Sequence, residues 1–202
     1  MRAVILFANS FISTLQGMKA IVYYKYGTPD NLELKEVDKP VPGDNEVLIK
    51  VYAVSINDWD LGLLGGDFIN RILNGLRKPK RKILGSDIAG RIEAVGKYVR
   101  KFKPGEEVYG DLSGRWGGFA EYVCAREKSL AIKPAAMSFE EAAAIPQAAM
   151  LAVQGLIDKG KIKQGQKLLI NGAGGGVGTF GIQIAKLYSA EVQVLTVMPN
   201  WK

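Results

Sequence analysis

The stretch Lys167-Leu-Leu-Ile-Asn-Gly-Ala-Gly-Gly-Gly-Val-Gly178 decides how the second half of the chain folds. Its first four residues, 167–170, have the composition of a short buried strand. Five glycines then fall within seven positions. An amphipathic run follows, in which apolar residues recur at helical spacing at Val177, Phe180, Ile184, Leu187 and Tyr188. The order strand, glycine loop, helix is the context in which such a loop indicates dinucleotide binding.

The spacing of the glycines has a physical meaning. Ala173, Gly175 and Gly178 fit the pattern A-x-G-x-x-G. In this pattern the first position makes a tight turn, the second lets backbone approach a pyrophosphate, and the third lets the helix pack closely on its strand. The free N–H groups of the helix N-terminus then face the phosphates. The predicted cofactor-binding residues are Gly172, Ala173, Gly174, Gly175, Gly176, Val177, Gly178 and Thr179.

Two other interpretations of this loop are an ordinary connection and a P-loop. An ordinary glycine-rich connection between strand and helix is the simpler alternative, and the loop alone does not exclude it. A P-loop is disfavoured, because no Lys-Ser or Lys-Thr pair follows the glycines.

The composition excludes several kinds of site. The chain has 202 residues, of which 48% are hydrophobic and 23% charged, as is typical of one or two globular domains. It contains no histidine and one cysteine, Cys124, which rules out Ser-His-Asp and Cys-His catalysis, an internal disulfide and a Cys-rich zinc site. We therefore expect no metal and a core position for Cys124. No apolar run is as long as a membrane span, so we expect a cytoplasmic protein without a membrane partner.

The net charge of +7 is concentrated in one segment. Residues 71–82 contain no acid and six cations, Arg71, Arg77, Lys78, Lys80, Arg81 and Lys82. The simple interpretation is a solvated basic loop, and the alternative is a nucleic-acid or membrane-surface patch. Because no stacking aromatics interleave with the charges, we expect no nucleic-acid partner.

The chain divides into three parts. Residues 1–17 are expected to form an N-terminal extension, since their apolar stretch is too short and interrupted for a good secretory signal. Residues 18–136 contain many short strand patterns separated by Gly and Pro, which predicts a small barrel-like β domain. The predicted strands are 19–24, 32–37, 46–56, 83–95, 107–109, 119–124 and 130–132, with loop and short helical turns at 61–76.

Residues 137–202 read as part of a nucleotide-binding domain. Ser138 and Glu141 form a capping box that opens a helix, Pro146 ends or kinks it, and a second helix is predicted over 147–159. The glycine-loop unit and a second buried-type strand at 191–197 then complete one βαβ unit. The predicted fold class is α/β, or α+β overall.

Four blocks in the same order carry a family resemblance: Leu84-Gly-Ser-Asp-Ile-Ala-Gly-Arg-Ile-Glu-Ala-Val-Gly96, Lys103-Pro-Gly-Glu-Glu-Val-Tyr-Gly110, Gly117-Gly-Phe-Ala-Glu-Tyr122 and the glycine loop itself. Together they resemble the medium-chain dehydrogenase/reductase superfamily, in its zinc-independent quinone oxidoreductase (zeta-crystallin-like) branch. The resemblance implies a GroES-like catalytic β domain followed by a Rossmann domain, with cofactor and substrate in the cleft between them.

The resemblance also implies the chemistry. Such enzymes transfer hydride from NADPH to a quinone, enone or aldehyde, and they form homo-oligomers through the Rossmann sheet. In Ser55-Ile-Asn-Asp-Trp59, Asn57 matches the family's asparagine beside the nicotinamide and substrate, where an amide can bind a carbonyl or the carboxamide. The alternative is that Asn57 only caps a loop or helix. Asp58, Trp59 and Asp60 are further candidates for the cleft wall. Relatives often have Thr where this helix reads Met150-Leu-Ala-Val153.

The sequence partly indicates whether the coenzyme is NADPH or NADH. NAD-specific units usually carry an acid about 20 residues after the glycines, at the end of the second strand. Residues 195–200 contain no acid, which favours NADPH over NADH. The cation nearest to this segment that could bind the 2′-phosphate of NADPH is Lys202.

The sequence stops five residues after the second predicted Rossmann strand, whereas the resemblance implies further strands and a return segment. We therefore expect a C-terminally truncated chain that is impaired as an enzyme and binds NADPH weakly or not at all. The alternative function is a non-catalytic fragment or isoform that associates with a full-length subunit.

Overall fold

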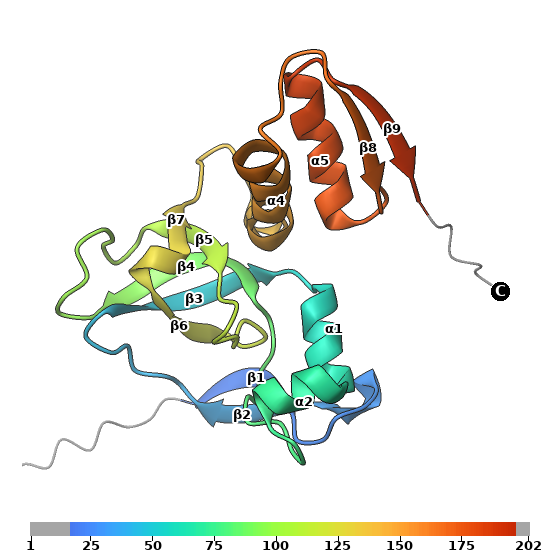
Figure 1. The fold of residues 1–202 in the computed structure, drawn as a ribbon. Coiled ribbons are helices and arrows are strands. Elements are labelled where there is room, and N and C mark those ends of the chain that lie inside the picture. Colours follow the sequence, from blue (N-terminus) through green and yellow to red (C-terminus); the bar gives the residue numbers. More distant parts are fainter. Residues whose placement is uncertain (1–16, 197–202) are drawn as a thin grey trace, which may run out of the picture.

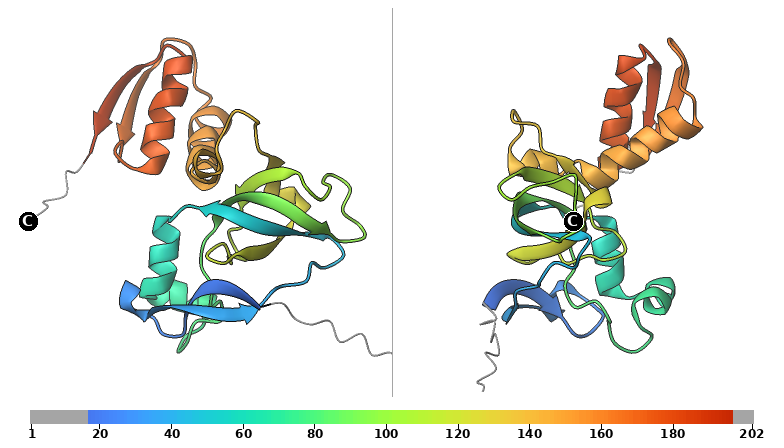
Figure 2. Two further views of the ribbon diagram at one scale, coloured as in Figure 1. Left: turned by 180° about the vertical axis from the view of Figure 1, so that it is seen from behind. Right: turned by 90° about the vertical axis from the view of Figure 1, so that its left-hand side faces the viewer.

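The computed structural model describes residues 17–196 (Figure 1). The predicted extension, apart from Gly17, and residues 197–202 lie outside the described residues. A β-rich part forms one end of the molecule, and α4, α5, β8 and β9 form the other (Figures 1 and 2). Among the described residues, no helix combines the length and apolar character needed to cross a bilayer.

The larger sheet is antiparallel, with strand order β6-β3-β4-β5-β7. Its strands are β3 (Glu46–Val54), β4 (Asp87–Val95), β5 (Glu107–Asp111), β6 (Tyr122–Arg126) and β7 (Leu130–Ile132). A second antiparallel sheet pairs β1 (Gly17–Tyr23) with β2 (Leu32–Asp38). Single bridges from Ala20 to Ala120 and from Val22 to Ile83 join β1 to the rest of this part. The predicted strand-rich domain is therefore confirmed.

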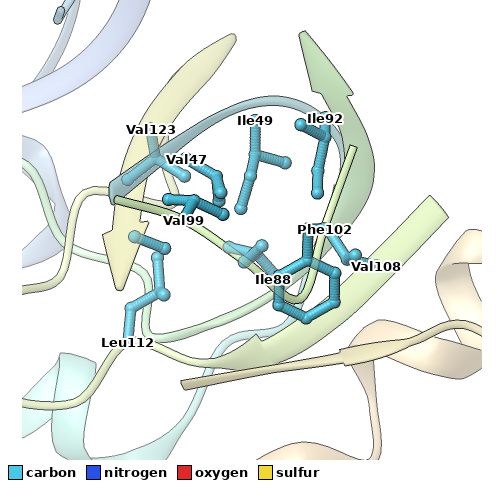
Figure 3. Close-up of a cluster of buried hydrophobic side chains, with 10 residues drawn as sticks. Val47, Ile49, Ile88, Ile92, Val99, Phe102, Val108, Leu112 and Val123 are labelled. Carbon is cyan, nitrogen blue, oxygen red and sulfur yellow. The ribbon is translucent and has the colours of Figure 1, made fainter. Parts of the chain in front are cut away.

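Apolar side chains from the strands and their loops fill the interior of the larger sheet (Figure 3). These side chains pack against one another because the sheet curls, which brings residues from non-adjacent strands into contact. The cluster consists of Val47, Ile49, Ile88, Ile92, Val99, Phe102, Val108, Leu112, Val123 and Ala125. This packing makes the sheet a rigid base for the loops and helices at its rim.

Two short helices, α1 (Asp58–Gly65) and α2 (Phe68–Asn74), lie between β3 and β4 in the sequence. They occupy the segment for which loop and short helical turns were predicted. Both lie beside β1 and β2 in Figures 1 and 2. Two 3-10 turns, η1 (Pro29–Asn31) and η2 (Glu127–Ser129), complete the connections of this part.

The helix α3 (Phe139–Ala143) opens at the predicted capping box. The Glu141 N–H donates to Ser138 Oγ (3.1 Å), and the Ser138 N–H donates to a Glu141 carboxylate oxygen (2.8 Å). Pro146 begins α4 (Pro146–Val153), so the predicted interruption is confirmed. The helix continues as a π-helical segment, η3 (Gln154–Lys159).

The last described elements are β8 (Lys167–Asn171), α5 (Gly176–Leu187) and β9 (Glu191–Leu195). The strands β8 and β9 pair in parallel, and α5 packs against α4 and crosses one face of the pair (Figure 1). The predicted βαβ unit is confirmed. The boundaries proposed between domains, at 17/18 and 136/137, stay predictions.

Candidate functional site

A cleft of about 550 Å³ lies where the β-rich part meets α4 and α5. Its wall comes from the residues just after β3, from α1 and α2, from α4 and from the first turn of α5. These residues are Ile56, Asn57, Asp58, Trp59, Gly62, Asp67, Asn70, Gln147, Ala148, Leu151, Gly176 and Val177. The cleft therefore joins two features that the sequence singles out 119 positions apart, Asn57 and Gly176 of the glycine loop.

The tight turn of the glycine loop is made by Gly172. Its φ of 78° is left-handed, which favours glycine. Ala173, to which the A-x-G-x-x-G pattern assigns the turn, is instead buried and does not have a positive φ. The N–H groups of Gly172 and Ala173 donate to the Leu195 carbonyl oxygen, at 2.9 and 3.2 Å. The loop is thus tied to the end of β9.

Gly178 has the packing role expected of the third position. A Cβ at Gly178 would lie 2.4 Å from the Gly172 carbonyl oxygen and 2.5 Å from Ala173 Cα. Both contacts are with backbone, which cannot move aside. Only glycine therefore lets the first turn of α5 approach the end of β8 so closely.

Gly175 differs, because the chain's own packing does not require glycine there. A Cβ at this position would come no closer than 3.5 Å to another atom, the Gly172 carbonyl oxygen, and the φ of Gly175 is −84°. The position is exposed. A ligand that approaches the backbone from outside gives a physical reason for glycine at this place.

The N-terminus of α5 presents free hydrogen-bond donors. The first intrahelical bond is from Thr179 N–H to the Gly175 carbonyl oxygen (3.0 Å), and no side chain caps the helix. The N–H groups of Gly176, Val177 and Gly178 therefore lack intrahelical acceptors. Together with the positive end of the helix dipole they suit a phosphate group. The loop fits the pyrophosphate of a dinucleotide.

Of the other predicted cofactor residues, Gly174 lies in the exposed part of the loop. Thr179 donates its hydroxyl hydrogen to the Gly176 carbonyl oxygen (2.8 Å), and its part in cofactor binding stays a prediction. Only Gly176 and Val177 reach the cleft itself.

Asn57 lies at the N-cap of α1 and also lines the cleft. Its backbone N–H donates to Asp60 Oδ2 (3.0 Å). Its side-chain amide donates to Ser86 Oγ (3.2 Å) and more weakly to Ser55 Oγ (3.4 Å). Ser86 is fully buried, so it fixes the direction of the amide. The capping interpretation accounts for the backbone of Asn57, whereas its side chain is held by serines at the cleft wall.

The three residues after Asn57 separate into two groups. Asp58 and Trp59 line the cleft, and Trp59 is 48% exposed. Asp60 is not in the cleft wall: it is 1% exposed and accepts a hydrogen bond from Gly85 N–H (2.9 Å). Burial raises the pKa of Asp60 above its ordinary value. Its role is to tie α1 to the start of the segment leading into β4.

Sequence reasoning did not find the link between Asp87 and Gln147. Asp87 is 1% exposed, and its Oδ2 accepts the N–H of Gln147 in the first turn of α4 (2.9 Å). Asp87 Oδ1 is buried without a hydrogen-bond partner among the described residues. Burial raises the pKa of Asp87 to about 6, and the Gln147 hydrogen bond opposes that rise. The sequence signal that could have indicated a buried role for Asp87 is its position directly before the apolar pair Ile88-Ala89.

The helix α4 presents Gln147, Ala148 and Leu151 to the cleft. Met150, within the segment where relatives often have Thr, lines a different cavity, between α4 and the strands β5 and β7. Leu151 therefore supplies the apolar contact that this helix offers at the site.

Among residues 17–196, the structure brings no obvious metal ligands together. In the part of the chain that the structure describes, no three Asp, Glu or Cys side chains cluster as a metal site would need. Cys124 lies half-buried in β6, and burial raises the pKa of its thiol to about 11. A thiol with so high a pKa is a poor nucleophile and a poor ligand at neutral pH. Zinc independence stays a prediction.

Comparison with known proteins gives the family. Residues 43–135 match the family model of the alcohol dehydrogenase GroES-like domain. The quinone oxidoreductase of Sus scrofa is 36% identical over 176 residues, which are 87% of this chain and 51% of that protein. The solved structure of the quinone oxidoreductase from Coxiella burnetii superposes with a TM-score of 0.81 at 33% identity, over 89% of this chain and 56% of that one. Over about half the length of these relatives, the chain is similar to the quinone oxidoreductase branch of the medium-chain dehydrogenase/reductase superfamily.

A further relative in this superfamily is the NADPH-dependent alkenal/one oxidoreductase of Arabidopsis thaliana, a chloroplastic protein. It is 36% identical over 183 residues, covering 86% of this chain and 46% of that protein. The chain spans about half the length of the curated relatives it matches. The family resemblance drawn from the four sequence blocks is thus confirmed.

Proposed function

We propose that this chain provides the catalytic cleft of an NADPH-dependent reductase that transfers hydride to a quinone or to an activated alkene or carbonyl. One observation carries the proposal: Asn57 and the N-terminus of α5 line the same cleft. A phosphate-binding helix end and a positioned amide at one cavity are what a dinucleotide needs at its central pyrophosphate and at its nicotinamide end.

Each residue has a distinct role in this proposal. The N–H groups of Gly176 and Val177 bind the pyrophosphate, and Gly175 lets it approach the backbone. The bound cofactor supplies the hydride, so the protein needs no nucleophile. The Asn57 side chain, oriented by Ser86, accepts a hydrogen bond from the nicotinamide carboxamide through its Oδ1, or donates to the substrate carbonyl in place of its weak bond to Ser55. Trp59 and Leu151 exclude water from the reacting atoms.

The proposed coenzyme is NADPH rather than NADH, and no zinc takes part. The Arabidopsis relative is named for NADPH, and residues 195–200 contain no acid for a ribose 2′-hydroxyl. Most of that segment, and Lys202, lie outside the described residues. The substrate is a small molecule, and the names of the relatives favour quinones, alkenals and enones.

The proposal is tested by following the oxidation of NADPH with a benzoquinone and with a short alkenal as acceptors. Asn57→Ala should lower the rate by about tenfold or more, because one oriented hydrogen bond at the reacting end is lost. Asn45→Ala, an exposed loop position outside the cleft, is the matched control and should leave it unchanged. Equal rates for both variants would remove Asn57 from the mechanism.

The affinity for NADPH is a separate question, and the sequence-based expectation is that this chain alone binds it weakly or not at all. Calorimetry on the 202-residue chain measures this directly. A micromolar dissociation constant would contradict the expectation and at the same time support the cleft as a cofactor site.

A second candidate function is association with a longer subunit or with a second copy. The apolar side chains Leu169, Val194 and Leu195 of β8 and β9 are 50–63% exposed, and β8 is the only strand paired with β9 among the described residues. Such a sheet edge favours pairing with another chain. Sedimentation of the chain alone and mixed with a full-length relative tests this candidate.

A further inference from the structure

The helix α2 exposes apolar side chains rather than burying them. Phe68, Ile69, Ile72 and Leu73 are 57–77% exposed, and Leu76 just after the helix is 66% exposed. An amphipathic helix of a globular protein normally turns such residues towards the core. A contiguous apolar patch of this kind marks an interaction surface.

The exposed residues lie on one side of the helix. At about 100° per residue, Phe68, Ile72, Ile69 and Leu73 fall within an arc of about 140°. The polar residues Asn70, Arg71 and Asn74 occupy the remainder of the circumference. The helix is therefore amphipathic, with its apolar side facing outward.

Polar bonds hold α2 in this orientation. Asn74 is fully buried: its side-chain amide donates to the Tyr23 hydroxyl (2.8 Å), and its Oδ1 accepts the Arg81 N–H (3.0 Å). Arg71 Nε donates to the Gly66 carbonyl oxygen (2.6 Å) and stacks over the Tyr26 ring at 4.7 Å. These contacts fix the orientation of α2, so its apolar side faces outward as part of the folded structure.

A basic loop follows directly. The Lys80 N–H donates to the Asn74 carbonyl oxygen (2.6 Å), which folds residues 75–80 back against the end of α2. Arg77, Lys78 and Lys80 on this loop are exposed, and none forms an ion pair with a described residue. Exposed cations and exposed apolar side chains thus lie next to one another on α2 and the loop that follows it. Figure 2 shows the ribbon of this segment on the outer side of the β-rich part in the right-hand view.

We propose that α2 and the loop of residues 75–82 form a docking surface for the anionic surface of a membrane. Large apolar side chains beside lysines and arginines match such an interface, where the former enter the headgroup boundary and the latter meet lipid phosphates. Nucleic acid would use the cations and leave the apolar side uncovered. A second copy of the chain would bring the same cations together, which is unfavourable.

This proposal departs from the sequence-based expectation of no membrane partner. That expectation rested on the lack of an apolar run long enough to span a membrane, and the exposed apolar side of α2 is seen only in the structure. The proposal concerns adsorption and not insertion across the bilayer. It is independent of the reductase function, since the outward side of α2 is not part of the cleft.

The test is cosedimentation of the full chain with vesicles of phosphatidylcholine alone and with a third of phosphatidylserine. The chain should bind the anionic vesicles at low salt and not the neutral ones. Binding should fall by about tenfold or more for Arg77→Gln/Lys78→Gln/Lys80→Gln, and similarly for Phe68→Ser/Ile72→Ser. The triple variant Lys159→Gln/Lys161→Gln/Lys163→Gln removes three exposed cations elsewhere and should bind as the parent does.

A second measurement reports insertion directly. In Phe68→Trp, anionic vesicles should shift the tryptophan emission to shorter wavelength relative to the parent protein. No binding to anionic vesicles, or equal binding by both triple variants, would overturn the proposal. So would a dimer that Phe68→Ser/Ile72→Ser abolishes, or DNA binding that needs the cations and not Phe68 and Ile72.

Discussion

Two glycines of the same loop serve different purposes at the residue scale. Gly178 is required by the fold, since any side chain would collide with the backbone of Gly172 and Ala173. Gly175 is not required by the fold, since a Cβ there meets nothing closer than 3.5 Å. The sequence pattern predicts glycine at both positions. It does not distinguish the two causes, because glycine is required at Gly178 by packing within the chain and is explained at Gly175 by the approach of a ligand.

The distinction gives a paired prediction. Gly178→Ala should lower the free energy of unfolding by about 2 kcal/mol, as overpacking does in close-packed sites. Gly175→Ala should leave stability within about 1 kcal/mol and weaken NADPH binding by about tenfold or more. Urea unfolding and ligand titration of both variants measure these effects. If Gly175→Ala binds NADPH like the parent chain, the loop has no close contact with the cofactor.

The Asp87 carboxyl predicts how stability depends on pH. Its pKa of about 6 in the folded protein exceeds the ordinary value of about 4, so the folded state retains a proton that the unfolded state releases. The contribution of Asp87 to the free energy of unfolding should therefore fall as pH rises from about 4 to 6 and stay low above that. Across the window the change is on the order of 2–3 kcal/mol.

Asp87→Asn tests this, because the amide keeps an acceptor for the Gln147 N–H but cannot ionise. The unfolding free energy of the parent minus that of Asp87→Asn should fall by this amount between pH 4 and 6. Asp38→Asn, at an exposed position, is the control. A pH profile for Asp87→Asn that superposes on the parent's would mean that Asp87 is not buried as the structure has it.

At the scale of elements, most of the chain was predictable from its sequence. The strand patterns and the Ser138–Glu141 capping box are local signals, and the structure has elements at each of them. The helices α1 and α2 were harder, since Gly62, Gly65 and Gly66 interrupt their pattern. The outward orientation of α2 was not predictable, because it depends on the buried bond between Asn74 and Tyr23, 51 residues away.

The capping box predicts a difference between two neighbouring acids of α3. Glu141→Ala should lower the free energy of unfolding by about 1 kcal/mol, because the Ser138 N–H loses its acceptor. Glu140→Ala removes an acid from the same first turn without breaking that bond and should cost less than half as much. Chemical denaturation of both variants measures the difference. Equal losses of unfolding free energy would mean that the two acids stabilise α3 only through their charge and not through the capping hydrogen bond.

At the scale of the whole molecule, the cleft depends on contacts between distant segments. The sequence predicted both Asn57 and the glycine loop, the first through the family resemblance and the second from its own pattern. It did not predict Gln147, Leu151 or Asp87, because nothing local shows that α4 lies across the start of β4. Long-range packing brings Asn57 and the glycine loop together, and local sequence patterns do not predict this packing.

The central claim is that one dinucleotide spans the cleft from the N-terminus of α5 to Asn57. Nuclear magnetic resonance of the isotope-labelled chain with NADPH tests it most directly. The amides of Gly174–Val177 should shift saturably, and nicotinamide protons should give NOEs to the Asn57 amide and the Trp59 ring. Saturable shifts confined to residues outside the cleft, or NOEs from the nicotinamide to neither side chain, would contradict the account.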